Sequence, residues 1–185
     1  MIKIILVLLL ITSSAHAELA LEVAQNKTQM EWKGASQAKY DYKLNTLGLV
    51  WFDNDSGFGA RFAYGKGRKT LPQPGAAIPN LVIELKHSID VEVLYRHILY
   101  GSTYAYYGLG YYFDNLPIEK LNSDYYKDDW DSGVGYMAGL EHRMNSYLSI
   151  QANIRKRASV GAAKSNSGAL GSSHNSIGVS IRYIF

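Results

Sequence analysis

The residues of this chain best suited to covalent chemistry are a histidine and a serine near its C-terminal end. His174 and Ser176 are two positions apart, so on a strand both side chains would lie on the same side. A serine beside a histidine base can form a hydrolytic nucleophile, but that chemistry also needs an acidic group to orient the imidazole. No Asp or Glu follows His174. The pair therefore predicts a polar loop, and we expect that the protein is not an enzyme.

A second candidate site is an acidic segment between about residues 114 and 130 that also carries large aromatic rings. Rings supply contact area and charges supply orientation, which is typical of a binding surface. A calcium site is one alternative, yet the aspartates do not have the spacing of a calcium-binding loop. A solvated loop without a partner is the other alternative. The residues of the predicted contact surface are Tyr125, Tyr126, Asp128, Asp129 and Trp130.

Strands must position these residues, because polar and apolar side chains alternate with a period of two along most of the chain. From Ile177 to Phe185, for example, every second residue is apolar or aromatic. Eight such segments follow one another, at about residues 19–26, 40–52, 58–64, 81–96, 107–113, 134–143, 148–157 and 177–185. Long polar loops, the first from about residue 27 to 38, alternate with short turns. This pattern predicts an all-β fold, an eight-stranded antiparallel up-and-down transmembrane β-barrel.

The N-terminal residues predict a secretory signal peptide. Lys3 precedes an apolar run over residues 4–11, and the segment ends with the small residues Ala15 and Ala17 around His16. The run is shorter than the ~20 apolar residues of a membrane-spanning helix, and Ala-His-Ala fits a cleavage site. We therefore expect a signal peptide over residues 1–17, export through the Sec pathway, and one mature barrel domain over residues 18–185.

Composition favours a membrane barrel over a soluble protein. Tyr occurs 15 times, whereas charged residues make up only 19% of the chain and the mean hydropathy is −0.14. Tyr and Trp form girdles at both interfaces of a membrane barrel, while the half of each strand that faces the lumen stays polar. A soluble barrel of the lipocalin type would instead turn its apolar side chains inward.

Composition also limits the partners. The net charge is +3 without a dense basic stripe, so nucleic acid is not expected as a partner. The chain has no Cys, and His87, His97 and His142 lack a supporting cluster of ligands. We therefore expect no metal and no cofactor.

If the apolar side chains face lipid, the charged ones on the opposite side of each strand face the lumen. Buried charges persist in so narrow a barrel only when they are paired. Two interpretations follow: a salt-bridged plug that makes the barrel rigid, or a narrow gated pore whose Arg and Glu residues exchange partners. The residues assigned to this lumen charge network are Glu22, Asp41, Lys43, Arg61, Glu84, Lys86, Asp90, Glu92, Arg96, Glu141, Arg143, Arg155, Arg157 and Arg182.

Three segments carry a resemblance to a known family: Tyr-Gly-Leu-Gly-Tyr at 107–111, the stretch 139–150 around a predicted turn, and Ile-Arg-Tyr-Ile-Phe at 181–185. They resemble the small eight-stranded outer-membrane barrels, the OmpA-type transmembrane domain and its OmpX-like relatives. The resemblance implies that Ile181, Tyr183 and Phe185 form a signal read by the barrel-assembly machinery. It further implies a monomer in the outer membrane of a Gram-negative bacterium, in contact with outer-membrane lipid and lipopolysaccharide.

The resemblance also limits the expected function. It implies a structural or surface-interaction role, such as envelope integrity, adhesion or contact with host factors through the extracellular loops. Lys66, Arg68 and Lys69 in one loop could contact lipopolysaccharide phosphates. A narrow small-solute pore is the first alternative. A lipid A-modifying enzyme is the second, because deacylases of similar fold use Ser, His and an acidic residue on the outer wall, although the surroundings of His174 and Ser176 differ from theirs.

Overall fold

A computed structural model of the chain describes residues 17–33, 38–67, 69–70, 81–115, 118–120, 126–127, 130–159, 163–165 and 168–185. Residues 1–16, which contain almost all of the predicted signal peptide, lie outside the described residues. No helix long and apolar enough to cross a membrane occurs among the residues described.

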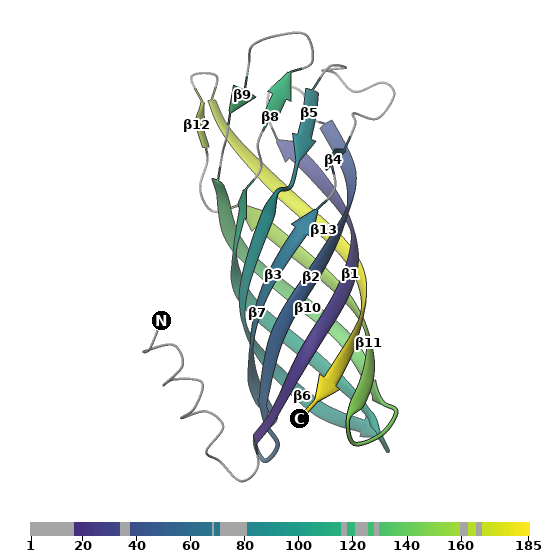
Figure 1. The fold of residues 1–185 in the computed structure, drawn as a ribbon. Coiled ribbons are helices and arrows are strands. Elements are labelled where there is room, and N and C mark those ends of the chain that lie inside the picture. Colours follow the sequence, from purple (N-terminus) through teal and green to yellow (C-terminus); the bar gives the residue numbers. More distant parts are fainter. Residues whose placement is uncertain are drawn as a thin grey trace, which may run out of the picture.

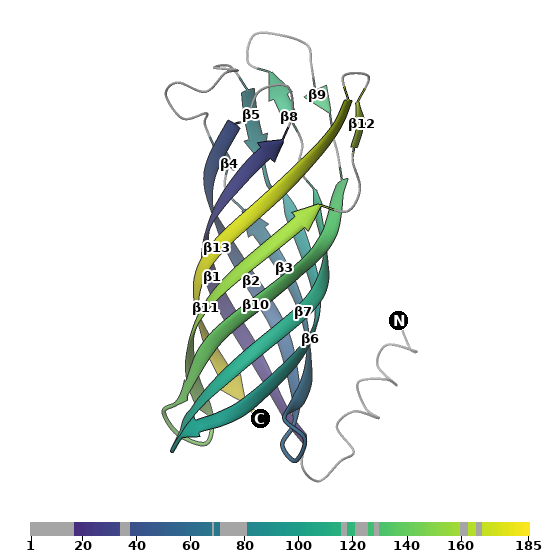
Figure 2. The same ribbon diagram turned by 180° about the vertical axis from the view of Figure 1, so that it is seen from behind.

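Within the described residues, eight long strands close into one antiparallel barrel (Figures 1 and 2). Each of these strands pairs with the long strand that follows it along the chain, and β1 also pairs with β13, which closes the ring. This arrangement confirms the predicted fold. The strands of the barrel are β1 (Ala17–Lys33), β2 (Ala38–Asp53), β3 (Phe58–Gly67), β6 (His87–Tyr100), β7 (Thr103–Asn115), β10 (Trp130–Arg143), β11 (Leu148–Ser159) and β13 (Gly168–Ile184).

Short turns join the strands at the end of the barrel where β1 begins and β13 ends (Figure 1). In the turn between β2 and β3, the Asp53 carboxylate accepts hydrogen bonds from the Ser56 hydroxyl, at 2.6 Å, and from the Asp55 amide, at 3.3 Å. Gly57 follows with φ of 74°, and a Cβ atom there would lie 2.3 Å from the Arg96 carbonyl oxygen. Only glycine satisfies both conditions, which explains why the chain reverses at this point.

The opposite end carries short additional strands (Figures 1 and 2). A separate sheet has the order β4-β5-β8-β9, and β12 pairs with β13. We call this the loop end of the barrel. The bounds of these strands are β4 (Lys69–Thr70), β5 (Leu81–Glu84), β8 (Ile118–Lys120), β9 (Tyr126–Lys127) and β12 (Ala163–Ser165).

Several predicted boundaries change, and β13, for example, begins at Gly168 instead of near residue 177. The strand predicted over residues 81–96 is divided into β5 and β6 at Leu85, which is buried and accepts a hydrogen bond from the Gly67 amide at 3.1 Å. Strand β1 continues to Lys33, although a loop was predicted from about Lys27. Its outward side chains are polar there, so the sequence resembles a loop, but Thr28 and Met30 remain buried inside.

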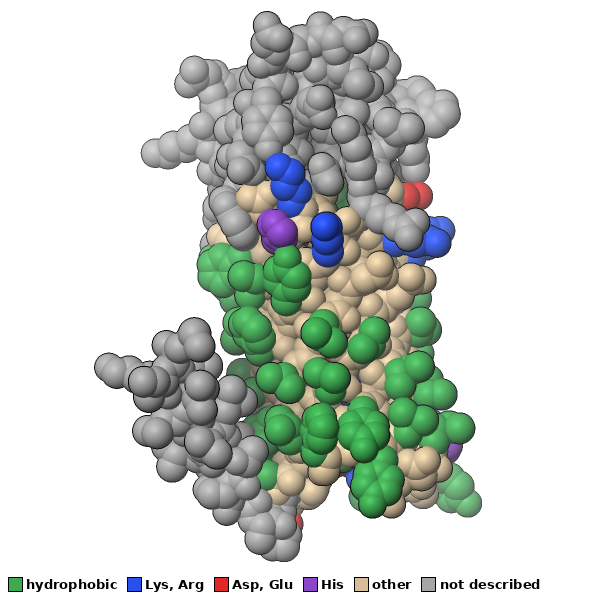
Figure 3. All heavy atoms as spheres, in the orientation of Figure 1, with side chains coloured by type: hydrophobic (Ala, Val, Ile, Leu, Met, Phe, Trp, Pro, Cys, Tyr) green, Lys and Arg blue, Asp and Glu red, His purple; other side chains and the backbone are tan. Residues whose placement is uncertain are grey.

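The outward face of the barrel in Figure 3 is apolar over its middle and lower part, and basic side chains lie above this belt toward the loop end. On β13, for example, Ile177 is 69% exposed, whereas its neighbours Ser176 and Gly178 are buried. The same alternation occurs along β3, β7 and β11. Side chains that would be core residues in a soluble protein therefore cover the outside.

The predicted orientation of β2 is wrong. Asp41 and Lys43 were assigned to the lumen, but both are exposed on the outer wall, whereas Tyr42, Leu44 and Phe52 are buried inside. This strand carries apolar residues on both sides, because Leu47 and Leu49 face outward as well, so alternation alone does not orient it. Phe52 is favoured inside because its ring packs against two guanidinium groups, those of Arg96 and Arg182.

Candidate functional site

The centre of the lumen is organised by Arg61 on β3. Its fully buried guanidinium donates hydrogen bonds to Glu22 on β1 at 2.8 Å, and to Glu92 and Asp90 on β6 at 2.9 and 3.4 Å. A planar guanidinium with several N–H groups can meet three carboxylates at once, which an ammonium group does less well. Arg61 therefore links strands β1, β3 and β6 across the interior.

Arg182 on β13 extends this network toward the turns. Its Nε atom lies 2.9 Å from the second oxygen of Glu22, and its Nη1 atom lies 3.0 Å from Glu141 on β10. Gln151 donates to the same Glu141 oxygen at 3.2 Å and accepts a hydrogen bond from Ser180 at 2.9 Å. Glu22 is thus shared by two arginines, one on each oxygen.

On the loop side of Arg61, Asp90 faces two more arginines. Arg155 and Arg157 on β11 approach its Oδ2 atom to 3.2 and 2.6 Å. Arg157 also lies 3.4 Å from Asp114 on β7, whose carboxylate is 3.9 Å from His174 Nδ1. The Tyr42 hydroxyl and the same His174 nitrogen are 2.8 Å apart. The network therefore runs continuously from Glu141 to the His174 side chain.

A second cluster closes the turn end of the lumen. Both carboxylate oxygens of Glu18 accept hydrogen bonds from Arg96, at 2.7 and 2.8 Å, and Arg143 also pairs with Glu18. The Phe52 ring lies between the two clusters, 4.1 Å below the Arg96 guanidinium and 5.5 Å from that of Arg182. An aromatic face stabilises a cation without adding charge, so Phe52 joins the clusters without a further carboxylate.

The charges inside the barrel balance. Among the described residues, six acidic and six basic side chains form this interior network, and each takes part in at least one ion pair. Every cation is an arginine. The acidic residues are Glu18, Glu22, Asp90, Glu92, Asp114 and Glu141, and the basic ones are Arg61, Arg96, Arg143, Arg155, Arg157 and Arg182.

The side chains around Asp90 are closely packed. A cavity beside Asp90, Glu92 and Arg157 has a volume of about 10 Å³, which is about the space of one water molecule. Two inward glycines contribute to this tight packing. A Cβ atom at Gly110 would lie 2.6 Å from Glu92 Cγ, and one at Gly178 would lie 2.0 Å from Asn26 Oδ1. The glycines thus leave room for the long polar side chains opposite them.

Most of the arginines and carboxylates that the sequence assigns to the lumen lie together in this network. Lys86 does not: it is half-buried at the break between β5 and β6. Glu84 is on β5, and the structure does not describe its side chain.

Sequence reasoning missed Glu18, Asp114 and His174. The alternation along each strand could have identified them, because each lies an even number of positions from an inward-facing residue. Glu18 is four positions from Glu22, Asp114 is four from Gly110, and His174 is eight from Arg182. All three stand at positions that were assigned to loops or to the start of the mature chain.

The His174 and Ser176 pair lies inside the barrel and not on its outer wall. Both side chains are buried, and the Ser176 hydroxyl lies 2.8 Å from that of Thr28. In this position neither side chain can reach an acyl ester in the surrounding lipid. No group of three or more His, Asp or Glu side chains among the described residues is arranged to hold a metal ion.

The remaining candidate residues divide between the two ends. Tyr125, Asp128, Asp129 and Arg68 lie outside the described residues. Tyr126 is in β9, Trp130 begins β10 and Lys69 is in β4, and their side chains are not described.

At the turn end, Ile181, Tyr183 and Phe185 all face outward and are at least half exposed. The Tyr183 ring stacks on Tyr147 at 6.5 Å and meets Phe185 edge-on at 5.2 Å.

Comparison with solved structures shows which proteins share this fold. Neisserial surface protein A has 14% identity and a TM-score of 0.58, with 87% of this chain and 97% of that chain covered. The outer membrane protein OprG of Pseudomonas aeruginosa has 12% identity and a TM-score of 0.56, covering 92% and 96%. Ail, the attachment invasion locus protein of Yersinia pestis, has 12% identity and a TM-score of 0.55, covering 92% and 99%, in a complex with the heparin analogue sucrose octasulfate.

No protein-family model matches the chain, and no curated protein matches it. At these identities the likeness concerns the fold, which is that of the small eight-stranded outer-membrane barrels.

Proposed function

We propose that this protein resides in the outer membrane of a Gram-negative bacterium as a closed barrel with a structural and surface-contact role. The observation that carries the proposal is the distribution of side chains. The outer wall exposes apolar residues to the surroundings, while the interior is filled by paired charges. In water such an outer belt would be a large exposed apolar surface, whereas in lipid it is the stable arrangement.

Residence in the outer membrane is tested by fractionation and by migration on a gel. The mature protein should begin at residue 18, collect in the outer-membrane fraction, and migrate faster unheated than after boiling, because a closed barrel resists detergent. A product that stays dissolved without detergent would contradict the proposal. Detection of residues 1–17 on the mature product would contradict Sec export with cleavage at the proposed site.

A plugged lumen is favoured over a pore because each charge of the interior network has a partner. Planar bilayers containing the protein should show no regular single-channel conductance. Glu141→Ala leaves Arg182 with Glu22 as its partner and opens space near the middle of the lumen. Steady conductance of the unchanged protein, altered by Glu141→Ala, would favour the small-solute pore instead.

The surface-contact role is assigned to the loop end, which would face the outside of the cell. Its support is the aromatic and acidic composition of residues 124–131 together with the fold shared with Ail. Deletion of residues 124–129, which leaves β10 complete, should reduce adhesion of cells or their binding of host factors without reducing the amount of folded barrel. Equal adhesion with and without the segment would leave only the structural role.

Assembly would depend on the closing strand. Ile181, Tyr183 and Phe185 present a row of exposed apolar side chains at the end of β13, where the barrel-assembly machinery would bind them. Phe185→Ala should lower the amount of folded barrel in cells but not the stability of barrels refolded in detergent. Equal losses in both assays would indicate a packing role only.

Lipid A modification is not favoured, because the Ser-His pair faces the lumen. Mass analysis of lipid A from cells that overproduce the protein or its Ser176→Ala variant tests this. A modification that is lost in the variant would contradict the structural role.

A further inference from the structure

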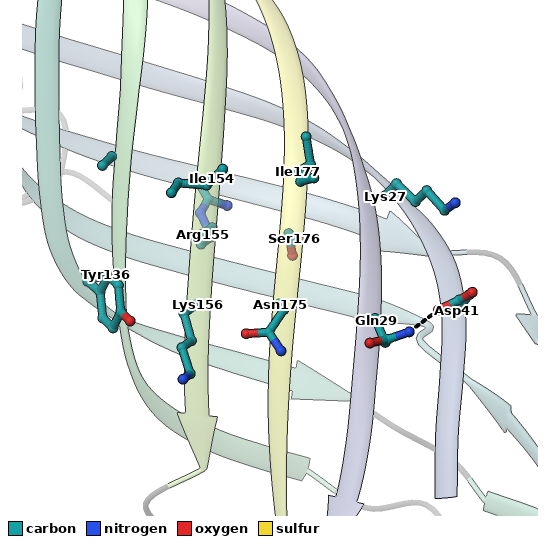
Figure 4. A pocket seen from close by; sticks show the side chains of 11 residues that line it. Lys27, Gln29, Asp41, Tyr136, Ile154, Arg155, Lys156, Asn175, Ser176 and Ile177 are labelled. Carbon is teal, nitrogen blue, oxygen red and sulfur yellow. Dashed lines mark hydrogen bonds between the residues drawn. The ribbon is translucent and has the colours of Figure 1, made fainter.

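A groove of about 510 Å³ crosses the outer wall of the barrel over β10, β11, β13, β1 and β2 (Figure 4). Most of the side chains that line it point outward, and only Arg155 and Ser176, which also line it, belong to the inner face of β11 and β13. Ile154, Ile177 and Tyr136 are 60%, 69% and 55% exposed, and Lys27, Lys156 and Asn175 are exposed as well. A concave surface of this size can hold part of a small molecule or of a lipid.

Strand register divides the groove into two adjoining rows. In the row nearer the loop end, Gln29 pairs with Asn175, which pairs with Lys156. In the next row, Lys27 pairs with Ile177, which pairs with Ile154. The row nearer the loop end is therefore polar, whereas the next row is apolar on β11 and β13 and ends in Lys27 on β1. An amphiphile has the same order of headgroup and acyl chain.

Positive charge is in excess at and beside the groove. Lys27 on β1 lies directly opposite Lys43 on β2, and both are exposed. Like charges at facing positions of neighbouring strands destabilise a sheet, and nothing in the fold requires them here. Lys156 adds a third cation, while Asp41, held by Gln29 at 3.2 Å, supplies one negative charge. An external anion would relieve this repulsion.

We propose that the groove binds a phosphorylated glycolipid of the membrane leaflet at the loop end. Its phosphate would lie between Lys27 and Lys156, near the Asn175 amide, with an acyl chain along Ile154 and Ile177 toward the middle of the barrel. Lys27 and Lys156 are two strands apart and offset by two residues along the strand, which is roughly 12 Å between their backbones, so their long side chains can reach one phosphate together. A soluble anion would leave the apolar row uncovered, and this favours a lipid.

This inference rests on the proposed membrane location, and the test separates the two. The folded protein in detergent micelles is mixed with lipid A carrying two phosphates, with the same lipid after enzymatic removal of both phosphates, or with sucrose octasulfate. Native mass spectrometry then measures the bound fraction at each concentration. The groove variant is Lys27→Gln/Lys156→Gln. The control is His142→Gln, an exposed polar residue at the turn end of β10 that does not line the groove.

The unchanged protein and the His142→Gln control should bind the phosphorylated lipid roughly 30-fold more tightly than the dephosphorylated lipid, since two lysines near an anionic surface each contribute severalfold. The groove variant should lose most of this preference and still bind both lipids. Three results would overturn the inference: no preference in the unchanged protein, an equal preference in the groove variant, or binding of sucrose octasulfate as tight as that of the phosphorylated lipid. A protein that fractionates outside the membrane would overturn the proposed function as well.

Discussion

The lumen and the outer rim of the belt use positive charge in opposite ways. In the part of the chain that the structure describes, the cations of the interior network are all arginines, and each has a carboxylate partner. The exposed cations are all lysines, at positions 27, 43, 66 and 156, and two of them face each other. Positive charge is thus neutralised by carboxylates inside the barrel, whereas on the outer wall it is available to a partner from the surroundings.

The chemistry of the two side chains explains this division. The guanidinium group is planar, offers several N–H donors in fixed directions and is weakly hydrated, so it can be buried among carboxylates from several strands. The ammonium group of lysine is strongly hydrated and sits on a flexible stem, which suits an interface where its partner comes from outside. The lumen is built for internal order, and the rim for contact with the surroundings.

The largest effect should come from Arg61→Met, which removes the centre of the interior network. Glu22, Glu92 and Asp90 would lose a shared partner inside the barrel, and an uncompensated buried charge costs about 3–5 kcal/mol of unfolding free energy. Urea unfolding of the barrel in lipid vesicles, followed by tryptophan fluorescence, measures this loss.

Arg61→Lys is the matched control for this comparison. It keeps the charge but not the planar fork, so its loss should be smaller than that of Arg61→Met and still measurable. If the Arg61→Lys variant were as stable as the unchanged protein, charge alone would matter in the lumen. The geometry of the guanidinium group would then not explain why the interior cations are arginines and the exposed ones lysines.

The next effect concerns the outer wall itself. Val179→Lys places a cation in the apolar belt on β13, where Val179 is 60% exposed, and should cost about 2–4 kcal/mol of unfolding free energy near the bilayer midplane. Asn175→Lys, two outward positions nearer the loop end, should cost at most about 1 kcal/mol because it lies at the polar rim. Equal costs in the same vesicles would mean that the belt does not end between these positions.

The sequence was sufficient to predict the closed barrel because the alternation is regular on most strands and the turns carry clear signals such as Asp53 to Gly57. Strand β2 was the exception, since its apolar residues lie on both sides and only the Arg96 and Arg182 guanidinium groups decide that Phe52 faces inward.

The ion-pair partners of the buried charges could not be predicted from the sequence for a similar reason. Glu22 pairs with residues 39 and 160 positions away, Arg61 and Arg182, and no local pattern encodes those distances. The groove was missed because its two rows form only when register brings β11, β13 and β1 together.

A moderate effect is expected at Phe52, which packs on arginines of both interior clusters. Phe52→Leu keeps an apolar side chain but removes the aromatic face below Arg96 and Arg182, and should cost about 1–2 kcal/mol of unfolding free energy. The double variant with Arg96→Met measures the coupling between the two residues. Additive losses would show that the ring only fills space.

The smallest effect should change sign with the lipid. Lys43→Gln removes the repulsion with Lys27, so in vesicles of zwitterionic lipid it should stabilise the barrel by about 0.2–1 kcal/mol. In vesicles that contain phosphorylated lipid A the same variant should lose this gain or become less stable than the unchanged protein, because the lipid already relieves the repulsion. Lys66→Gln is the control, since Lys66 faces the neutral Asn45 and should change little in zwitterionic lipid. If Lys43→Gln had the same effect in both lipids, the lysines of the rim would have no anionic partner in the membrane, and the contrast between lumen and rim would reduce to a difference in solvation.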